Sequence, residues 1–281
     1  MKRYSLSFFM AVLFFLPMEA KSGSATTDYS DVRIQDLKLG TQAWTFRKFS
    51  FYETLDMLQE LDLHYLEAYP GQVLGKNNPD VRFSHNLSDK EMAKIKKALE
   101  EHDIKLLCYG VVGFDNNEES MKVVFEFAKK MGIRTIVTEP KYDDFSIIEK
   151  MVKKYNIQVA IHNHPYPSKY AYPQTVLDHI RGLDERIGAC ADIGHWMRTG
   201  LNVVESLRLL EGRILDVHFE DLDEIGSKKA NTVPFGQGEA NIHDVLAELT
   251  RQNYFGMLAT ELEQGEIVKD PVPTIRDGKV Y

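Results

Sequence analysis

The sequence predicts a single-domain α/β protein, a closed (β/α)8 barrel, in residues 37–281. First, short apolar runs recur along the chain, and each is followed by a turn and a segment whose apolar residues are spaced three and four apart. This is the pattern of parallel strands that alternate with amphipathic helices. Second, no linker or low-complexity stretch interrupts residues 39–263. Third, roughly 245 residues suffice for one barrel or for two small domains, and the unbroken alternation favours the barrel.

Eight apolar runs are the expected strands of this barrel. They are residues 39–44, 65–69, 105–112, 135–138, 158–162, 187–192, 214–219 and 257–261. The same rhythm also fits an open, doubly wound sheet, but eight strands separated by seven helices match a closed barrel better.

Seven amphipathic segments between these runs are the expected helices: residues 50–61, 88–102, 118–131, 144–155, 173–183, 203–211 and 241–252. Ser88 and Glu91 have the spacing of a capping box, in which each side chain bonds an otherwise unpaired backbone amide at the start of a helix. The last helix is expected to be short or irregular, because the chain after the eighth strand contains Gly265, Pro271, Pro273 and Gly278.

The N-terminus has the layout of a cleaved secretory signal. Lys2 and Arg3 precede an apolar run, residues 4–18, that is shorter than the roughly 20 residues needed to cross a bilayer. Cleavage is expected near Ala20 or Ala25, so residues 1–25 are predicted to be a signal peptide. An uncleaved membrane anchor is the alternative. The prediction is therefore an exported protein, periplasmic or secreted, with no stable membrane insertion after cleavage.

Charge and cysteine content narrow the choice of partners. The net charge of −8 argues against a nucleic-acid partner, because such proteins need a basic face that displaces counterions. Cys108 and Cys190 are the only cysteines, and both fall inside expected strands. They are predicted to be buried free thiols rather than a disulfide.

Ionisable side chains occupy the ends of five consecutive expected strands. In a barrel of this kind the C-terminal ends of the strands gather at one rim, where active sites lie. Unpaired buried carboxylates are very costly, so a divalent cation is the simplest common partner for the group. Mixed carboxylate and imidazole ligands suit Mn, Zn, Co or Fe better than Ca. The residues concerned are Glu139, His162, His164, Asp192, His195, His218 and Glu261.

Strand geometry relates the members of the His162-Asn163-His164 triplet. Alternation along a strand sends His162 and His164 to one face and Asn163 to the other, so two imidazoles enter the same space. The acidic run at residues 220–224 is interpreted as a solvated loop. The remaining histidines are interpreted as structural: His64, His85, His102, His179 and His243.

Asp192-x-x-His195, His218 and Glu261, in this order, resemble the metal site of the xylose isomerase-like TIM-barrel superfamily, also called the sugar phosphate isomerase/epimerase family. Residues 39–42 and the Gly-rich stretch 234–239 add to the resemblance, which spans nearly the whole mature chain. It implies one divalent metal ion, held in the family by a Glu on strand five, an Asp on strand six, a His on strand seven and a Glu on strand eight. Here His162 stands where the first Glu is expected.

This departure leaves one ligand open among His162, His164 and Glu139. The expected metal ligands are then drawn from His162, Glu139, Asp192, His218 and Glu261. His164, Glu261 and His195 are the expected catalytic residues. Substrate contacts are expected from Glu67, Lys141 and Trp44.

The resemblance implies an enzyme that removes a proton next to a metal-polarised carbonyl of a sugar or keto-sugar, an isomerase or epimerase in the broad sense. The alternative is a lyase or hydratase that cleaves 3-keto-glycosides by β-elimination. A non-catalytic sugar-binding module is a possibility of another class. An abasic-site nuclease of the same fold needs three metals and more histidines than the chain supplies at this rim. The sequence predicts no oligomeric state.

Overall fold

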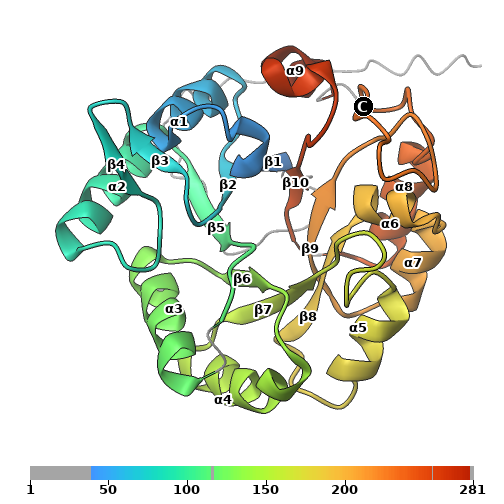
Figure 1. Ribbon diagram of the computed structural model, residues 1–281, viewed down its shortest axis with the longest axis horizontal. Coiled ribbons are helices and arrows are strands. Elements are labelled where there is room, and N and C mark those ends of the chain that lie inside the picture. The colour runs from blue at the N-terminus through green and yellow to red at the C-terminus, as the bar shows by residue number, and fades with distance from the viewer. Residues whose placement is uncertain (1–38, 115–116, 255, 279–281) are drawn as a thin grey trace, which may run out of the picture. The chain divides into compact units, whose positions relative to one another are not determined.

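The computed structural model describes residues 39–114, 117–254 and 256–278 of the chain (Figure 1). Eight parallel strands close into a barrel in the order β1, β10, β9, β8, β7, β6, β5, β2. Their bounds are β1 (Leu39–Gln42), β2 (Tyr65–Ala68), β5 (Lys105–Tyr109), β6 (Thr135–Thr138), β7 (Gln158–His162), β8 (Ile187–Asp192), β9 (Ile214–Phe219) and β10 (Leu258–Thr260). The predicted fold class is confirmed.

Helices surround the barrel in Figure 1 and follow the predicted segments closely. The capping box at Ser88 and Glu91 is present. Short elements at the C-terminal end, η4 (Glu266–Lys269) and α9 (Val272–Gly278), confirm the weak last crossover. The other predicted helices are α1 (Phe51–Glu60), α2 (Asp89–Glu101), α3 (Glu118–Met131), α4 (Phe145–Tyr155), α5 (Pro173–Ile180), α7 (Val203–Leu209) and α8 (Ile242–Arg251).

Five short elements are absent from the prediction. A hairpin of β3 (Val73–Gly75) and β4 (Asn78–Arg82) follows β2 and packs against α1. The 3-10 turns η2 (Ala43–Phe46) and η3 (Tyr142–Asp144) follow β1 and β6, and helix α6 (Ile193–Thr199) follows β8 without a loop. These elements span three to seven residues, too few to show a hydrophobic period.

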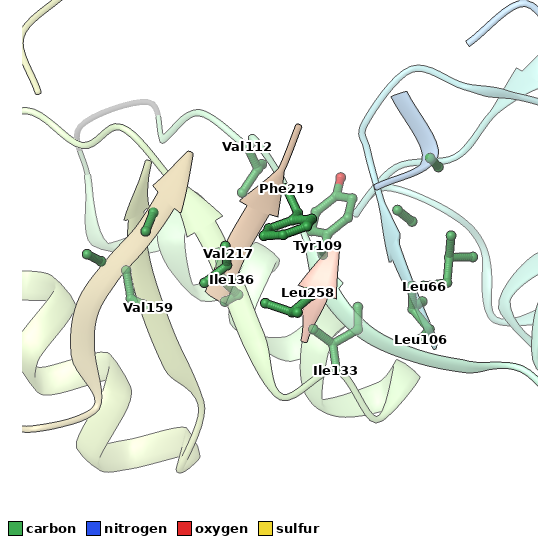
Figure 2. Close-up of a cluster of buried hydrophobic side chains, with 14 of the residues drawn as sticks. Leu66, Leu106, Tyr109, Val112, Ile133, Ile136, Val159, Val217, Phe219 and Leu258 are labelled. Carbon is green, nitrogen blue, oxygen red and sulfur yellow. The ribbon is translucent and has the colours of Figure 1, made fainter. Parts of the chain in front are cut away.

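Apolar side chains fill both faces of the barrel strands, as expected for a parallel sheet covered by helices. All six residues of β8 are buried. Figure 2 shows part of this core, with Leu66, Val159, Val217 and Leu258 from four different strands. Cys108 and Cys190 are buried and free, which confirms their prediction as thiols.

The acidic run after β9 is not a solvated loop, so that interpretation is wrong for its first two residues. Glu220 and Asp221 are both buried. Asp221 accepts hydrogen bonds from the backbone amides of Gly236, Gly238 and Ala240 at 2.8, 3.0 and 3.1 Å. The carboxylate therefore fixes the Gly-rich loop to the end of β9, which offsets its desolvation.

The predicted signal peptide, residues 1–25, lies outside the described residues. Within the described ranges, no helix combines the length and the apolar character needed to cross a membrane.

Candidate metal centre

Four side chains at the C-terminal ends of adjacent strands form a buried cluster. His162 ends β7, Asp192 ends β8, His218 lies near the end of β9 and Glu261 follows β10. Asp192 and His218 are direct partners in the register of β8 and β9. One nitrogen or oxygen atom from each of the four residues lies within 4.8 Å of the others. The strand ends therefore bring a mixed nitrogen and oxygen donor set to one point.

The atoms that converge there have no hydrogen-bond partner among the described residues. They are His162 Nε2, His218 Nδ1 and Glu261 Oε2. Asp192 Oδ2 lies 3.5 Å from His162 Nε2 and 3.7 Å from His218 Nδ1, and Glu261 Oε2 lies 2.6 Å from His218 Nδ1. Leaving buried polar atoms unpaired is costly, and ligation of one cation would satisfy all four. Two imidazoles with two carboxylates fit Mn, Zn, Co or Fe.

Each imidazole of the cluster is oriented through its other nitrogen. His162 Nδ1 donates to Glu139 Oε1 at 3.1 Å, and His218 Nε2 donates to Glu67 Oε2 at 2.9 Å. A carboxylate can only accept, so these bonds fix the tautomers and leave His162 Nε2 and His218 Nδ1 as lone-pair donors. Such a carboxylate–histidine pairing is the usual support of a metal-ligating histidine.

The electrostatics of the cluster favour positive charge at its centre. Burial lowers the pKa of His162, but hydrogen bonds to Asp192 and Glu139 outweigh it and raise the pKa to about 9. The pKa of His218 is also raised, against the effect of burial, by the neighbouring acidic side chains. Burial raises the pKa of Asp192, yet the surrounding imidazoles hold it well below its usual range. A divalent cation supplies the same positive charge without protonating the imidazoles.

Asn163 fixes the spacing of the two strands that carry the first two candidate ligands. Its side chain donates from Nδ2 to the backbone oxygen of Asp192 and accepts from the Asp192 backbone amide, both at 3.0 Å. Asp192 also caps α6, because its Oδ1 accepts from the His195 amide at 2.6 Å. His162 and His164 both reach Glu139 Oε1, whereas Asn163 bonds the backbone of β8.

A cavity of about 250 Å³ lies above the cluster. His164 is at its rim, with a side chain that is 49 % exposed, whereas the side chain of His162 is 2 % exposed. His164 Nδ1 donates to the same Glu139 Oε1 that holds His162, which leaves His164 Nε2 free. Its ring stacks on that of His195, with 4.9 Å between the centroids. The cavity is lined by Gln42, Trp44, Tyr69, Pro70, Val111, His162, His164, His195, Glu261 and Glu263.

A buried ion-pair network behind His195 was not predicted from the sequence. Arg198 Nη1 lies 2.8 Å from both Glu220 Oε2 and Glu263 Oε2. Glu220 is also bonded by Thr232, and it accepts from the Glu263 amide at 3.0 Å. The network joins α6, the end of β9 and the segment after β10. In the sequence, this network is indicated only by Glu263, which lies two positions after Glu261 and, by strand alternation, on the same face as Glu261.

His195 is a neutral imidazole with a defined tautomer. Burial lowers its pKa to about 3, with smaller contributions from the neighbouring His162, His164 and Arg198, although Asp192 opposes this. Arg198 Nη1 lies 3.2 Å from His195 Nδ1, and a guanidinium can only donate, so Nδ1 accepts and Nε2 carries the proton. His195 therefore offers a hydrogen-bond donor at the cavity.

The three predicted substrate-contact residues have different positions. Trp44 lines the cavity. Glu67 is fully buried below the cluster, bonded to His218, and does not line the cavity. Lys141 is exposed at the start of η3, where its backbone amide donates to Asp144, and it also lies outside the cavity lining.

The barrel, the strand-end cluster and the cavity above it describe a class of (β/α)8 proteins with a candidate metal site at the C-terminal rim. The family model for the xylose isomerase-like TIM barrel matches residues 55–278. The chain belongs to this family. Among curated proteins, none matches the chain.

Solved structures with the same fold include one with appreciable sequence identity. An uncharacterised protein from Parabacteroides distasonis is 32 % identical with a TM-score of 0.71, and the match covers 87 % of this chain and 97 % of that one. The IolI protein, solved with a bound zinc atom, is 17 % identical with a TM-score of 0.69, over 87 % and 96 % of the chains. The 3-keto-D-glucoside 4-epimerase YcjR from E. coli is 17 % identical with a TM-score of 0.64, over 87 % and 98 %.

Proposed function

We propose that this protein is a metal-dependent enzyme of the isomerase or epimerase type, which removes a proton from the carbon next to a carbonyl of a sugar or keto-sugar. The observation that carries the proposal is the convergence of four buried donor atoms, three of which have no hydrogen-bond partner among the described residues. His162, Asp192, His218 and Glu261 would hold the ion. The zinc atom in IolI and the keto-sugar substrate named for YcjR agree with this assignment.

A bound divalent ion would polarise the sugar carbonyl and stabilise the negative charge that develops when the neighbouring proton leaves. His164 is suited to take that proton, since Glu139 holds its Nδ1 and leaves Nε2 free at the cavity. Glu261, at the base of the same cavity, is a second group able to carry a proton. His195 would donate through Nε2 to a substrate oxygen. Glu139 then serves as a positioning residue for both imidazoles rather than as a ligand.

A second candidate is a lyase that cleaves 3-keto-glycosides by β-elimination, and the tautomer of His195 favours it. In that reaction a base takes the proton at C2, the electron pair forms a C1–C2 double bond, and the group at C1 leaves with a proton from an acid. His164 and the Nε2–H of His195 supply one base and one donor at the same cavity. The epimerase pattern of two metal-bound glutamates is absent, because His162 replaces one of them.

The test is a screen of 3-keto-glucosides and free ketoses in deuterated water with metal-loaded protein. Deuterium incorporation next to the carbonyl is expected, and it reports the proton step even when the reaction is reversible. Ketose interconversion would assign the epimerase, and release of the aglycone would assign the lyase. Metal-loaded protein that exchanges no proton in any of these compounds would overturn the proposal.

We also propose that the enzyme works outside the cytoplasm. Support comes only from the sequence of residues 1–25, with its basic start and short apolar run. N-terminal sequencing of the protein recovered from a periplasmic fraction would test this, with a new start near residue 21 or 26 expected.

A further inference from the structure

The cavity above the metal centre has two walls of different chemistry. The ionisable arc consists of His162, His164, His195, Glu261 and Glu263, which follow β7, β8 and β10. The aromatic arc consists of Trp44, Tyr69, Pro70 and Val111, which follow β1, β2 and β5. Gln42, at the end of β1, also lines this wall, but its side chain donates to the Gly110 backbone oxygen and accepts from the Trp44 amide. These two groups of strands occupy different stretches of the barrel order, β10 to β7 and β5 to β1. A ligand in the cavity therefore meets polar atoms on one side and an apolar surface on the other.

Trp44 is held in place before any ligand binds. Arg47 covers the indole ring at 5.2 Å from its centroid, and Tyr69 meets the ring edge-on at 5.1 Å. The Arg47 guanidinium is itself fixed, since it donates to the backbone oxygens of Leu262 at 3.2 Å and Glu263 at 2.7 Å. The Trp44 side chain is nevertheless 39 % exposed and lines the cavity. A pre-positioned, exposed indole is a binding surface for a flat apolar face, because its ring loses little freedom on contact.

The charge of the cavity lining restricts the charge of the ligand that can bind. Its lining contains two carboxylates and three imidazoles, and no lysine or arginine among the described residues. Asp192 and Glu261 would already balance the two charges of a divalent ion. Arg198 lies behind this wall and is paired with Glu220 and Glu263. A phosphate dianion would find no cationic side chain in the cavity lining to offset its charge.

The size of the cavity limits the size of the ligand that can bind. Pockets for drug-sized ligands span about 300–1,000 Å³, and this cavity measures about 250 Å³. One sugar ring fits such a volume, whereas an oligosaccharide does not fit inside it.

We propose that the substrate is an uncharged, ring-closed pyranose whose apolar C–H face lies on Trp44, with its oxygens turned toward the ionisable arc. Sugar phosphates, which lack a cationic partner in this lining, and acyclic polyols, which present no flat C–H face to Trp44, should bind more weakly. The inference rests on the proposed function for the position of the reacting carbonyl, and it narrows that function to pyranoses and pyranosides.

The test measures binding to metal-loaded protein by calorimetry and by tryptophan fluorescence. The probes are a panel of methyl pyranosides with gluco, galacto and manno configurations, the acyclic polyol D-glucitol, and D-glucose 6-phosphate. Trp44 is the exposed tryptophan and Trp196 is buried, so a fluorescence change reports the cavity. At least one pyranoside should bind at least tenfold more tightly than glucitol and glucose 6-phosphate.

Variants separate stacking from general surface effects. Trp44→Ala should weaken binding of the preferred pyranoside about tenfold, which corresponds to about 1.4 kcal/mol. Tyr172→Ala is the matched control, because Tyr172 is a 44 % exposed aromatic residue outside the cavity lining, and it should leave affinity unchanged. Glucose 6-phosphate or glucitol binding as tightly as every pyranoside, or an unchanged affinity in Trp44→Ala, would overturn the inference.

Failure of this inference is distinguishable from failure of the proposed function. Metal content is measured on the same samples. Trp44-dependent pyranoside binding by protein that takes up no metal would support the inference and remove the proposed function. Proton exchange by metal-loaded protein that shows no preference for pyranoses would support the proposed function and remove the inference.

Discussion

The ionisable arc and the aromatic arc sit on one rim but are built in different ways. In the ionisable arc, strand-end side chains hold each other in place: Glu139 fixes two imidazoles, and Arg198 fixes Glu263. In the aromatic arc, Trp44 is fixed by ring contacts and by a guanidinium that bonds backbone carbonyls. Substitutions in the first arc should therefore change metal binding and proton transfer, and those in the second should change sugar affinity or stability alone.

The largest expected effect is the loss of the metal in Asp192→Asn. Removing this charge leaves the two imidazoles with Glu261 as the sole anionic ligand, while the asparagine can still cap α6. Metal content measured by mass spectrometry should fall from about one ion per chain to a small fraction, because the ligands act as one set. Asp143→Asn, an exposed aspartate in η3, is the control. Two or three ions per chain in the parent protein would also contradict the single-site assignment.

The next effect is a slower proton step in His164→Ala. If His164 is the general base, deuterium exchange should slow by about 10²- to 10⁴-fold while the metal stays bound. His243→Ala, at an exposed histidine, should exchange at the parental rate. Exchange by His164→Ala at that same rate would move the base to Glu261 or Glu139.

Glu261→Gln keeps an oxygen ligand and removes a proton-carrying group. Turnover should fall further than metal occupancy, by about 10-fold or more, if Glu261 shares the acid–base work. Equal losses of turnover and metal occupancy would assign Glu261 to the metal alone.

Glu139→Gln tests whether one carboxylate supports both imidazoles. The loss should weaken metal affinity by about 10- to 100-fold, the usual effect of removing a partner of a ligating histidine. Competition with a chelator of known affinity measures this. Glu149→Gln, in α4, is the control. Complete loss of the metal would show that Glu139 is a ligand itself.

The smallest effect is expected in Ser50→Ala, at the start of the helix that follows η2. Ser50 caps α1 through a full capping box with Glu53. Its loss should cost about 1 kcal/mol of unfolding free energy, or roughly 2–4 °C in Tm for a domain of this size. Metal content should not change. A fall in metal content alongside Tm would mean that the start of α1 is coupled to the metal site.

The periodic pattern of apolar residues predicted the barrel strands and the strand ends that carry most of the candidate metal ligands. The strands carrying His162, Asp192 and His218 follow from apolar runs, and strand alternation alone places His162 and His164 on one side. These inferences need only local geometry. The clustering of those residues near Glu261 follows from closure of the barrel.

The parts of the site that were not predicted depend on contacts between segments that are distant in the sequence. Arg198 was not recognised because α6 is seven residues long and begins directly after the last residue of β8. Gly194 shows how closely α6 packs against Glu220, since a Cβ at this position would lie 2.3 Å from Glu220 Oε2. This packing is visible only in the structure. Glu67, expected to contact substrate, instead bonds His218, a contact between distant strands that the sequence does not show. Lys141, expected in the same role, is exposed and lies outside the cavity lining.

The two thiols in the barrel interior provide a chemical marker of barrel opening. Burial raises the pKa of Cys108 and Cys190 well above the usual range, so neither is a thiolate in the folded protein. A maleimide dye should therefore leave the native protein unlabelled and react only with molecules whose strands have separated. The labelling rate then measures how often the barrel opens. The decrease of this rate on addition of metal measures how much the bound ion stabilises the closed barrel.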